Sequence, residues 1–271
     1  MRLLRFRPHP ILSPYVETVW LFESTSGLPA GDVRTIVPNG RIKLIIPFRS
    51  DQFIAVGDKV ALHRQESITV TGMMDGPVVV HTAAENIGIL GVEFKTAAAF
   101  HFLGLPLKEL TDTIVDIGDV LGRPGTELQE RIADVAVPEK IRQVEHLLVS
   151  RLCNSPGVET LVSRAVGAIS ASDGRIRIED LCSEIGLSRR YLDMKFADQV
   201  GISPKALARI VRFQRIYKLL SQGQTLGAPQ AVDDDYYDQA HLIKEFKQFT
   251  GYSPGLFSRQ SNDFGGIFYR D

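Results

Sequence analysis

The strongest constraint on the fold is a change in sequence pattern part-way along the chain. Up to about Leu121, short segments rich in β-branched residues alternate with turns of Gly, Pro, Asn and Asp. These segments are 42–46, 53–56, 67–70, 77–80 and 87–94. From Val158 onward, every segment instead has the apolar spacing of a helix. We therefore expect two domains of different class in one chain.

The turn formers Asn154-Ser155-Pro156-Gly157 mark the boundary between these patterns. The expected order is an N-terminal domain at 1–153, a linker at 154–157, a helical domain at 158–260 and a tail at 261–271. Short strands with no helices between them predict a barrel or sandwich, not a Rossmann sheet. Helices are expected at 97–103, 125–137 and 138–153, and a short one after Ser13. The helix at 138–153 either packs on its own barrel or forms a dimer contact.

Composition excludes several classes of protein. Hydrophobic residues make up 44% and charged residues 23%, which is ordinary for a globular chain with a real core. No apolar stretch approaches the ~20 residues of a membrane span, so no membrane partner is expected. The basic start lacks the apolar stretch of a signal peptide, so export is not expected. Two cysteines, Cys153 and Cys182, fit a reducing cytosol.

A helix-turn-helix pattern spans Ile178 to Phe196. The segment 178–185 is a short amphipathic helix, Gly186 can adopt positive φ in a tight turn, and Ser188 is a good N-cap for the next helix. That next helix begins with two arginines, which suit contacts with guanine edges or phosphates in a major groove. The alternative is a plain helical hairpin with a solvated charged face.

A long helix follows at 204–221, where Ser203 is the expected N-cap and Pro204 the first helical residue. Its basic residues recur at steps of three: Arg209, Arg212, Arg215 and Lys218. Such steps drift around a helix by about 60° per pair, so the residues form a broad band. The band is either solvated surface or a phosphate contact.

Residues of about 160–260 resemble the DNA-binding domain of AraC/XylS-type transcription regulators, which has two helix-turn-helix units joined by a long helix. The first unit matches through 186–192 and the second through 236–246. The endings Gly201-Ile202-Ser203-Pro204 and Gly251-Tyr252-Ser253-Pro254 lie 50 residues apart and mark the duplication. Residues 1–150 resemble the cupin-type barrel of one subgroup, with weaker markers at 37–40, 91–94 and 103–106.

The resemblance implies an α+β fold with a cupin-like N-terminal β-barrel, flanking helices and a C-terminal all-α tandem of helix-turn-helix units. It implies DNA contacts in the first groove from Arg189, Arg190, Asp193 and Lys195. The long helix would add Arg212 and Arg215. The second groove would be read by Gln239, Ala240, Ile243 and Lys244. His241 stands where the family has a buried aromatic residue, so we expect it in the core.

Two departures from the family pattern stand out. The first helix of the second unit, 226–235, contains Pro229, which breaks a helix, and Asp235, which replaces the turn glycine. We expect this helix to be frayed and the second unit to be degraded. In the first unit, Met194 replaces a commonly basic residue and removes one expected DNA contact.

No enzyme motif is present, and His63, His81 and His101 have no metal-ligand spacing, so no catalytic residue, metal or cofactor is expected. The expected function is a cytoplasmic, sequence-specific transcription regulator that binds double-stranded DNA. The family resemblance suggests an activator, while the residues leave the sign of regulation open. The barrel would sense a small molecule or form a homodimer. The alternative is an enzyme or ligand-binding barrel whose helical domain has lost DNA binding.

Overall fold

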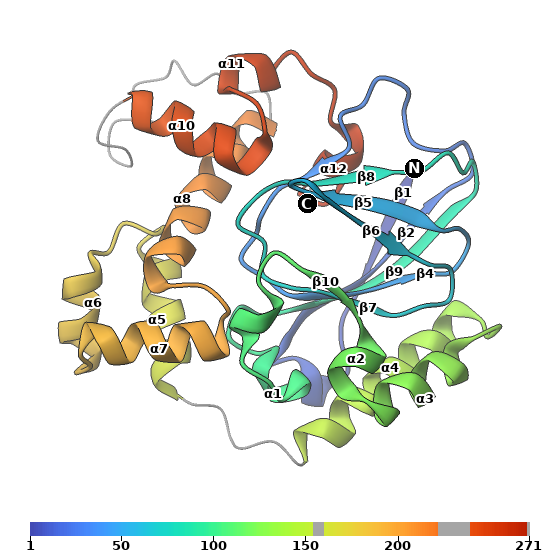
Figure 1. Cartoon of the computed structure of the whole chain (residues 1–271), viewed down its shortest axis with the longest axis horizontal. Helices are drawn as coiled ribbons and strands as arrows, with labels where there is room; N and C mark the ends of the chain where they lie inside the picture. Colours follow the sequence, from blue (N-terminus) through green and yellow to red (C-terminus); the bar gives the residue numbers. More distant parts are fainter. Residues whose placement is uncertain (154–159, 222–238, 270–271) are drawn as a thin grey trace.

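The computed structural model describes residues 1–153, 160–221 and 239–269. Two parts follow one another along the chain, antiparallel sheets with flanking helices and then an all-helical part (Figure 1). This confirms the expected two-domain α+β organisation. The linker expected at 154–157 lies outside the described residues, so the exact domain boundaries stay a prediction.

The N-terminal part contains two antiparallel sheets. The first has strand order β1-β2-β9-β4-β7-β10 and the second β3-β8-β5-β6. The strands of the first sheet are β1 (Arg2–Phe6), β2 (Val16–Ser24), β9 (Ile87–Phe94), β4 (Lys43–Pro47), β7 (Thr69–Thr71) and β10 (Ile114–Asp116). Those of the second are β3 (Thr35–Ile36), β8 (Val78–His81), β5 (Gln52–Val56) and β6 (Lys59–His63).

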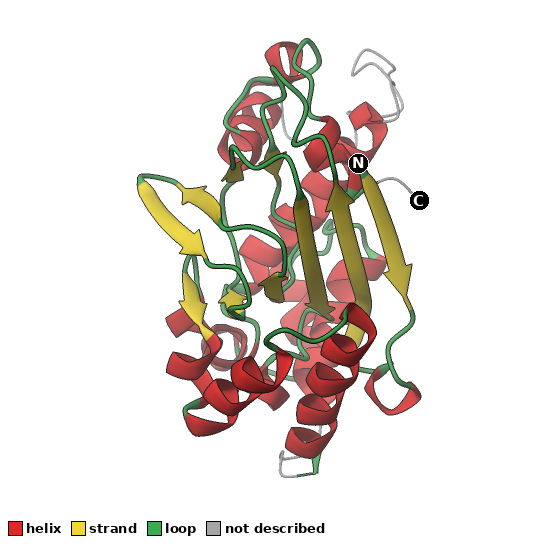
Figure 2. Cartoon of the chain, turned by 90° about the vertical axis from the view of Figure 1, so that its right-hand side faces the viewer, coloured by secondary structure: helices red, strands yellow, loops and turns green. Residues whose placement is uncertain are grey.

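The expected sheet-rich N-terminal domain is present, and its barrel is open, because the two sheets remain separate. Each sheet ends in edge strands, and no strand pairing joins the sheets within the described residues. Figure 2 shows the long strands and the shorter ones as separate groups. The strands β3, β7 and β10 have only two or three residues each, too few to carry a hydrogen-bond ladder from one sheet into the other.

Strand β9 forms the centre of the first sheet, and all eight of its residues are buried. Gly91 pairs with Trp20 of β2. A Cβ atom at Gly91 would lie 2.1 Å from Cε2 of Trp20, so the indole ring packs directly on the glycine backbone. The glycine therefore lets a large aromatic ring lie between the sheets, where it lines the interior.

Helices cover one side of the sheets. They are η1 (Pro10–Leu12), α1 (Phe100–Leu103), η2 (Leu107–Leu110), α2 (Ile117–Leu121), α3 (Arg123–Ile132) and α4 (Val137–Leu152). Pro138 stands in the first turn of α4, as expected. Val144, Leu147 and Leu148 of α4 are buried in the same core as the sheet residues, so α4 packs on its own domain.

The short helix expected after Ser13 is wrong. A 3-10 turn occurs earlier, at Pro10–Leu12, and Val16 already begins β2. The β-branched and aromatic residues that follow, such as Val19 and Trp20, favour a strand, and β2 pairs along its length with β9. Tertiary pairing therefore overrides the local N-cap signal.

The C-terminal part is helical in all its described segments. It contains α5 (Thr160–Ala171), α6 (Ile178–Ile185), α7 (Arg189–Gln199), α8 (Pro204–Ser221), α10 (Gln239–Thr250), α11 (Pro254–Phe257) and α12 (Asp263–Ile267). Figure 1 shows α8 running between the region of α5–α7 and the region of α10 and α11. The long helix α8 therefore joins the two helical units.

Aromatic side chains hold α8 to the second unit. Phe213 of α8 lies 4.8 Å from Phe249 and 5.6 Å from Phe246, measured between ring centroids, and all three are buried. Tyr217, one turn further along α8, lies 5.7 Å from Phe257 of α11. This cluster fixes α10 on α8.

The segment after α11 folds back onto the N-terminal domain. We call residues 261–269 the C-terminal tail. Asn262 donates to the carbonyl of Thr35 (2.8 Å) and accepts from its amide (2.9 Å), while the Asp32 carboxylate accepts from the amides of Asp263 and Phe264 (2.9 and 2.8 Å). Figure 1 shows α12 beside β8, far from α10. The tail is therefore part of the sheet domain's core.

We predict that Phe264→Ala destabilises the protein by about 3–5 kcal/mol. The side chain is 1% exposed and packs edge to face on Phe22 (5.3 Å between centroids), so its removal leaves a cavity among aromatic rings. Urea unfolding followed through Trp20, the one tryptophan of the chain, measures the change. Leu256→Ala is the control, since Leu256 is 47% exposed and its loss should cost under about 0.5 kcal/mol. Equal stability of the two variants would contradict the prediction.

Candidate nucleic-acid interface and ligand cavity

The turn between α6 and α7 has the geometry expected from the sequence. Gly186 has a φ of 76° and donates its amide to the carbonyl of Cys182 (2.9 Å). The Ser188 hydroxyl caps α7 by accepting from the amide of Tyr191 (3.3 Å). Leu192 and Phe196 are fully buried, which fixes the side of α7 that faces outward.

The outward side of α7 carries the residues expected in the first groove. Arg189 and Arg190 are exposed, and Asp193 and Lys195 are half-buried. Arg189 pairs with Glu179 of α6 (2.7 Å) and with Asp193 (3.7 Å), so two carboxylates orient its guanidinium. The ammonium of Lys195 lies 5.4 Å from the centre of the Tyr191 ring. The four residues therefore lie together on one helix.

The start of α7 points away from the sheet domain. The other end of the helix contacts that domain: Lys108 of η2 pairs with Asp198 (2.9 Å), and the Thr111 hydroxyl donates to the Gly201 carbonyl (2.6 Å). Since α7 is roughly 16 Å long, its arginines lie far from these contacts. Figure 1 shows α6 and the start of α7 at the outer edge of the molecule.

Arg212 of α8 is oriented inward. Its side chain is 18% exposed, donates to the Gly174 carbonyl (2.6 Å) and lies 3.9 Å from the buried Glu245 carboxylate. Arg209 donates to the same carboxylate (2.5 Å) and to Gln248 (2.6 Å). Arg215 lies further along α8 and is half-buried. A phosphate contact by Arg212 or Arg215 stays a prediction.

Helix α10 carries the residues expected in the second groove. Gln239 is its first residue, and Ala240, Ile243 and Lys244 are exposed. The expectation for His241 is wrong: its side chain is 48% exposed and lies 3.9 Å from Glu245. The polar partner at i+4 and the buried Leu242 place His241 off the core side. The segment 226–235, expected to be frayed, lies outside the described residues.

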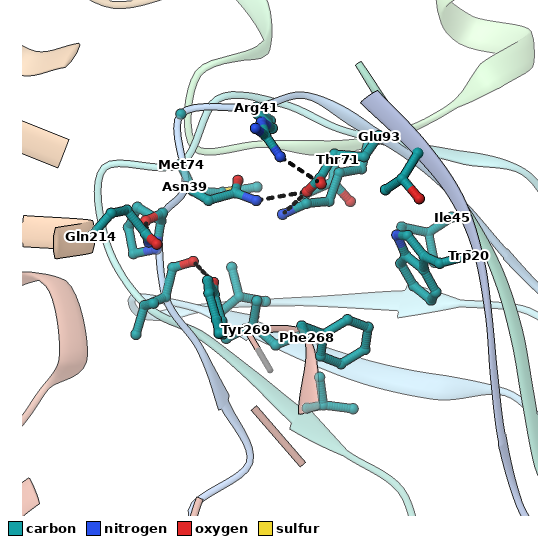
Figure 3. Close-up of a pocket in the computed structure, with 18 of the residues that line it drawn as sticks. Trp20, Asn39, Arg41, Ile45, Thr71, Met74, Glu93, Gln214, Phe268 and Tyr269 are labelled. Atoms are coloured by element: carbon teal, nitrogen blue, oxygen red, sulfur yellow. Dashed lines mark hydrogen bonds and ion pairs between the residues drawn. The ribbon is translucent and has the colours of Figure 1, made fainter. Parts of the chain in front are cut away.

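A cavity of about 360 Å³ lies between the two sheets. Its apolar wall includes Trp20, Ile45, Ile54, Met74, Val78 and Phe268. Its polar corner consists of Asn39, Arg41, Lys43 and Glu93, and Gln214 and Tyr269 are further polar residues of the lining. Figure 3 shows Asn39 and Arg41 directed at Glu93, with Phe268 and Tyr269 across the space and Gln214 at another side of it. Such an apolar interior with a few convergent polar groups is typical of a small-molecule site.

The polar corner is organised around Glu93, which is 8% exposed. One carboxylate oxygen accepts from Asn39 (2.6 Å), and the other accepts from Arg41 (3.1 Å). The ammonium nitrogen of Lys43 lies 3.7 Å from a carboxylate oxygen of Glu93. Burial alone would raise the pKa of Glu93, but Lys43 and Arg41 outweigh it and lower that pKa. Burial lowers the pKa of Lys43, against the attraction of Glu93.

The sequence did not single out these cavity residues as a binding site. Two of the weaker family markers, Val37-Pro38-Asn39-Gly40 and Gly91-Val92-Glu93-Phe94, nevertheless contain Asn39 and Glu93. The structure joins these markers through the hydrogen bond between the Asn39 amide and the Glu93 carboxylate. A search for polar residues within otherwise apolar strand motifs could have found them.

The helical domain supplies part of the cavity wall. Gln214 of α8 lines the cavity and donates to the carbonyl of Pro38. Tyr269 of the C-terminal tail donates its hydroxyl to the carbonyl of Val37 (2.6 Å), and burial raises the pKa of its phenol well above its usual value. Leu207 and Val211 of α8 also line the cavity. An occupant that fills the cavity would therefore touch both domains.

The described residues contain no group of three His, Cys, Asp or Glu side chains placed to hold a metal ion. Among the helices that the structure describes, none is long and apolar enough to cross a membrane. Cys153 is exposed and Cys182 is buried, and both are free thiols.

Two family models match the chain. One is a domain of unknown function (DUF6597) over residues 4–116, and the other is a helix-turn-helix domain over residues 181–260. The comparison with curated proteins gives no match. The second match and the geometry of α6 and α7 define a DNA-binding transcription regulator. This match and the two units joined by α8 support the resemblance of the helical domain to that of AraC/XylS-type regulators.

Several solved structures resemble the chain at low identity. ToxT from Vibrio cholerae is 12% identical, with 89% of this chain and 97% of that chain covered and a TM-score of 0.47. Wild-type ToxT from Vibrio cholerae strain SCE256, bound to an unsaturated fatty acid, is 12% identical, with coverages of 92% and 96% and a TM-score of 0.48. The AraC-like transcriptional activator CuxR is 14% identical, with coverages of 83% and 89% and a TM-score of 0.27.

We predict that the stability of the protein depends on His63 between about pH 6.5 and pH 4. His63 lines the cavity at 2% exposure, and burial lowers its pKa from 6.5 to about 4. The unfolded chain therefore binds the proton first as the pH falls, and the free energy of unfolding drops by up to about 3 kcal/mol across this window.

Denaturant unfolding at several pH values tests this, with His63→Gln as the variant that cannot titrate. The difference between wild type and His63→Gln should change across the window, whereas His81→Gln, at an exposed position, should follow wild type. Parallel curves for wild type and His63→Gln would show that His63 is not the group responsible.

Proposed function

We propose that this transcription regulator recognises specific DNA sequences by placing α7 and α10 in successive major grooves, about 34 Å apart on one face of the duplex. The observation that supports this most is the exposed start of α7, with Arg189 and Arg190 at the end opposite the sheet domain. Cations there can approach a duplex without displacing either domain.

The proposed roles of the individual residues follow from their positions on α7 and α10 and, for Asp193, from its ion pair with Arg189. Arg190 and Lys244 would read base edges, while Gln239 and Ala240 would contact the groove at the start of α10. Asp193 would orient Arg189 rather than contact DNA, because its carboxylate lies 3.7 Å from that guanidinium. Arg189 and Lys195 would pair with phosphates or bases.

We predict that Arg190→Ala weakens binding to a cognate duplex by about 1–3 kcal/mol and weakens binding to random duplex less. The cognate duplex would be selected from a random pool with the wild-type protein, and fluorescence anisotropy at fixed salt would give the affinities. Arg123→Ala is the matched control, since Arg123 is an 88% exposed arginine of the sheet domain. Equal losses on both duplexes would make Arg190 a phosphate contact.

If selection yields no preferred duplex, with or without metabolite extract, the rival function is favoured. In that case the chain would be a ligand-binding protein or enzyme whose helical domain no longer binds DNA. A working regulator must share a compartment with DNA, which supports the cytoplasmic location. Formation of a homodimer stays a prediction.

We further propose that a small molecule bound in the cavity controls the regulator. The support is the composition of the wall: Gln214, Leu207 and Val211 come from α8, and Phe264, Phe268 and Tyr269 come from the C-terminal tail. A ligand that favours one position of these groups shifts the helical domain relative to the sheets. The same contacts make DNA binding and ligand binding mutually dependent.

We predict that Ile45→Trp abolishes binding of cavity ligands, because the added ring fills part of a space of about 360 Å³. A panel of small amphiphilic acids and uncharged apolar alcohols would be screened by thermal shift on wild type. Any compound that stabilises wild type should fail to stabilise Ile45→Trp. Ile11→Trp is the control, since Ile11 is 55% exposed and does not line the cavity, and it should keep the shift. A compound that stabilises all three proteins binds elsewhere.

A further inference from the structure

Both helices proposed to enter the grooves expose a large apolar side chain on their outward faces. Met194 of α7 is 49% exposed and Ile243 of α10 is 41% exposed. Isolated apolar residues on a surface are ordinary in themselves. Here each occurs on the face that carries the exposed cations of its helix, and this shared position calls for a common partner.

Helix geometry places Met194 at the centre of the outward face of α7. At 100° per residue, it lies two positions from both Leu192 and Phe196, which are fully buried, and one turn beyond Arg190. Arg190 and Met194 therefore form neighbouring points, one cationic and one apolar. The major groove of DNA offers both kinds of group, because phosphates and guanine edges are anionic or accepting and each thymine adds an apolar methyl group.

The outward face of α10 has a related but different pattern. Ala240, Ile243 and Lys244 are all exposed, while Leu242 and Phe246 are buried. When the two units are superposed by sequence, Arg190 corresponds to Ala240 and Met194 to Lys244. At the first of these two matched positions α7 has a cation and α10 has alanine, and at the second α7 has methionine and α10 has a cation. We therefore expect the two helices to read different sequences.

In the major groove, the one apolar group on the base edges is the 5-methyl group of thymine. We infer that Met194 and Ile243 are specificity residues that read thymine methyl groups, beside bases contacted by Arg190 and Lys244. This inference rests on the proposed function, in which α7 and α10 enter the grooves. It also gives Met194 a role: its thioether chain replaces a phosphate or base contact of a basic residue with an apolar one.

The experiment removes the methyl group without changing base pairing. In a duplex selected with wild-type protein, each thymine is replaced in turn by deoxyuridine, and affinities are measured by fluorescence anisotropy at fixed salt. At least one position per groove should lose about fourfold in affinity, the value of one buried methyl group. Met194→Ala should bind the thymine duplex about fourfold more weakly and become indifferent to deoxyuridine at one position. Ile243→Ala should do the same at another position.

Further variants separate the alternatives. Met194→Lys should bind random DNA more tightly through the added charge but lose its discrimination of thymine. Val60→Ala is the control, since Val60 is 67% exposed on the sheet domain, and it should respond to deoxyuridine as wild type does. If a preferred duplex exists but no deoxyuridine position distinguishes wild type from Met194→Ala and Ile243→Ala, the inference is overturned and the proposed function stands.

A second copy of the chain is the competing partner for this face. Sedimentation of wild type and Met194→Ala would reveal it. An oligomer that Met194→Ala disperses, with no change in thymine discrimination, would assign the apolar face to self-association and overturn the inference. Failure to select any duplex would overturn the proposed function as well.

Discussion

The return of the C-terminal tail to the sheet domain is the interaction on which the rest of the structure depends. The Asp32 carboxylate accepts hydrogen bonds from two backbone amides at the start of α12, and Asn262 forms two hydrogen bonds with the backbone of Thr35. Phe264 and Phe268 then complete the aromatic packing around Phe22 and Trp20. Because Asp32, Thr35 and Phe264 are buried and paired, the chain is held to the sheets after α11.

The C-terminal tail and α8 together line one side of the cavity. The sheets alone would leave the space open toward α8, but Gln214 and Tyr269 bind the carbonyls of Pro38 and Val37 at its rim. The charged corner around Glu93 therefore lies beside groups of the DNA-binding domain. Buried charges of this kind are costly unless they are paired, and here Asn39 and Arg41 satisfy both carboxylate oxygens. Both domains therefore contribute side chains to the lining of this cavity.

The helical domain is built so that its interior and its exposed face are independent. Phe196 and Phe213 are buried in the interior, and Arg209 and Arg212 converge on the buried Glu245. The start of α7 has no part in that packing. Arg190 and Met194 are exposed, so we expect changes at these positions to leave the folding of the domain unaffected.

Much of the helical domain could be predicted from sequence, because its signals are local. A cap, a turn glycine and the spacing of buried residues act within one or two turns of helix, and Ser188, Gly186 and Leu192 behave as expected. The strand at Val16–Ser24 could not be predicted from its N-cap-like start, because its pairing partner β9 lies some seventy residues away. His241 was likewise misplaced, since its exposure depends on how α10 rolls against α8.

The sequence by itself determined the two domains, the helix-turn-helix pattern and the buried side of α7, because each is encoded by short-range periodicity and turn chemistry. Only the tertiary structure decided that the two sheets stay separate, that the tail packs against them, and that Asn39, Lys43 and Glu93 meet at one corner of a cavity. Those features join residues far apart in the chain, and such contacts are set by packing and burial, which leave no local signal to read.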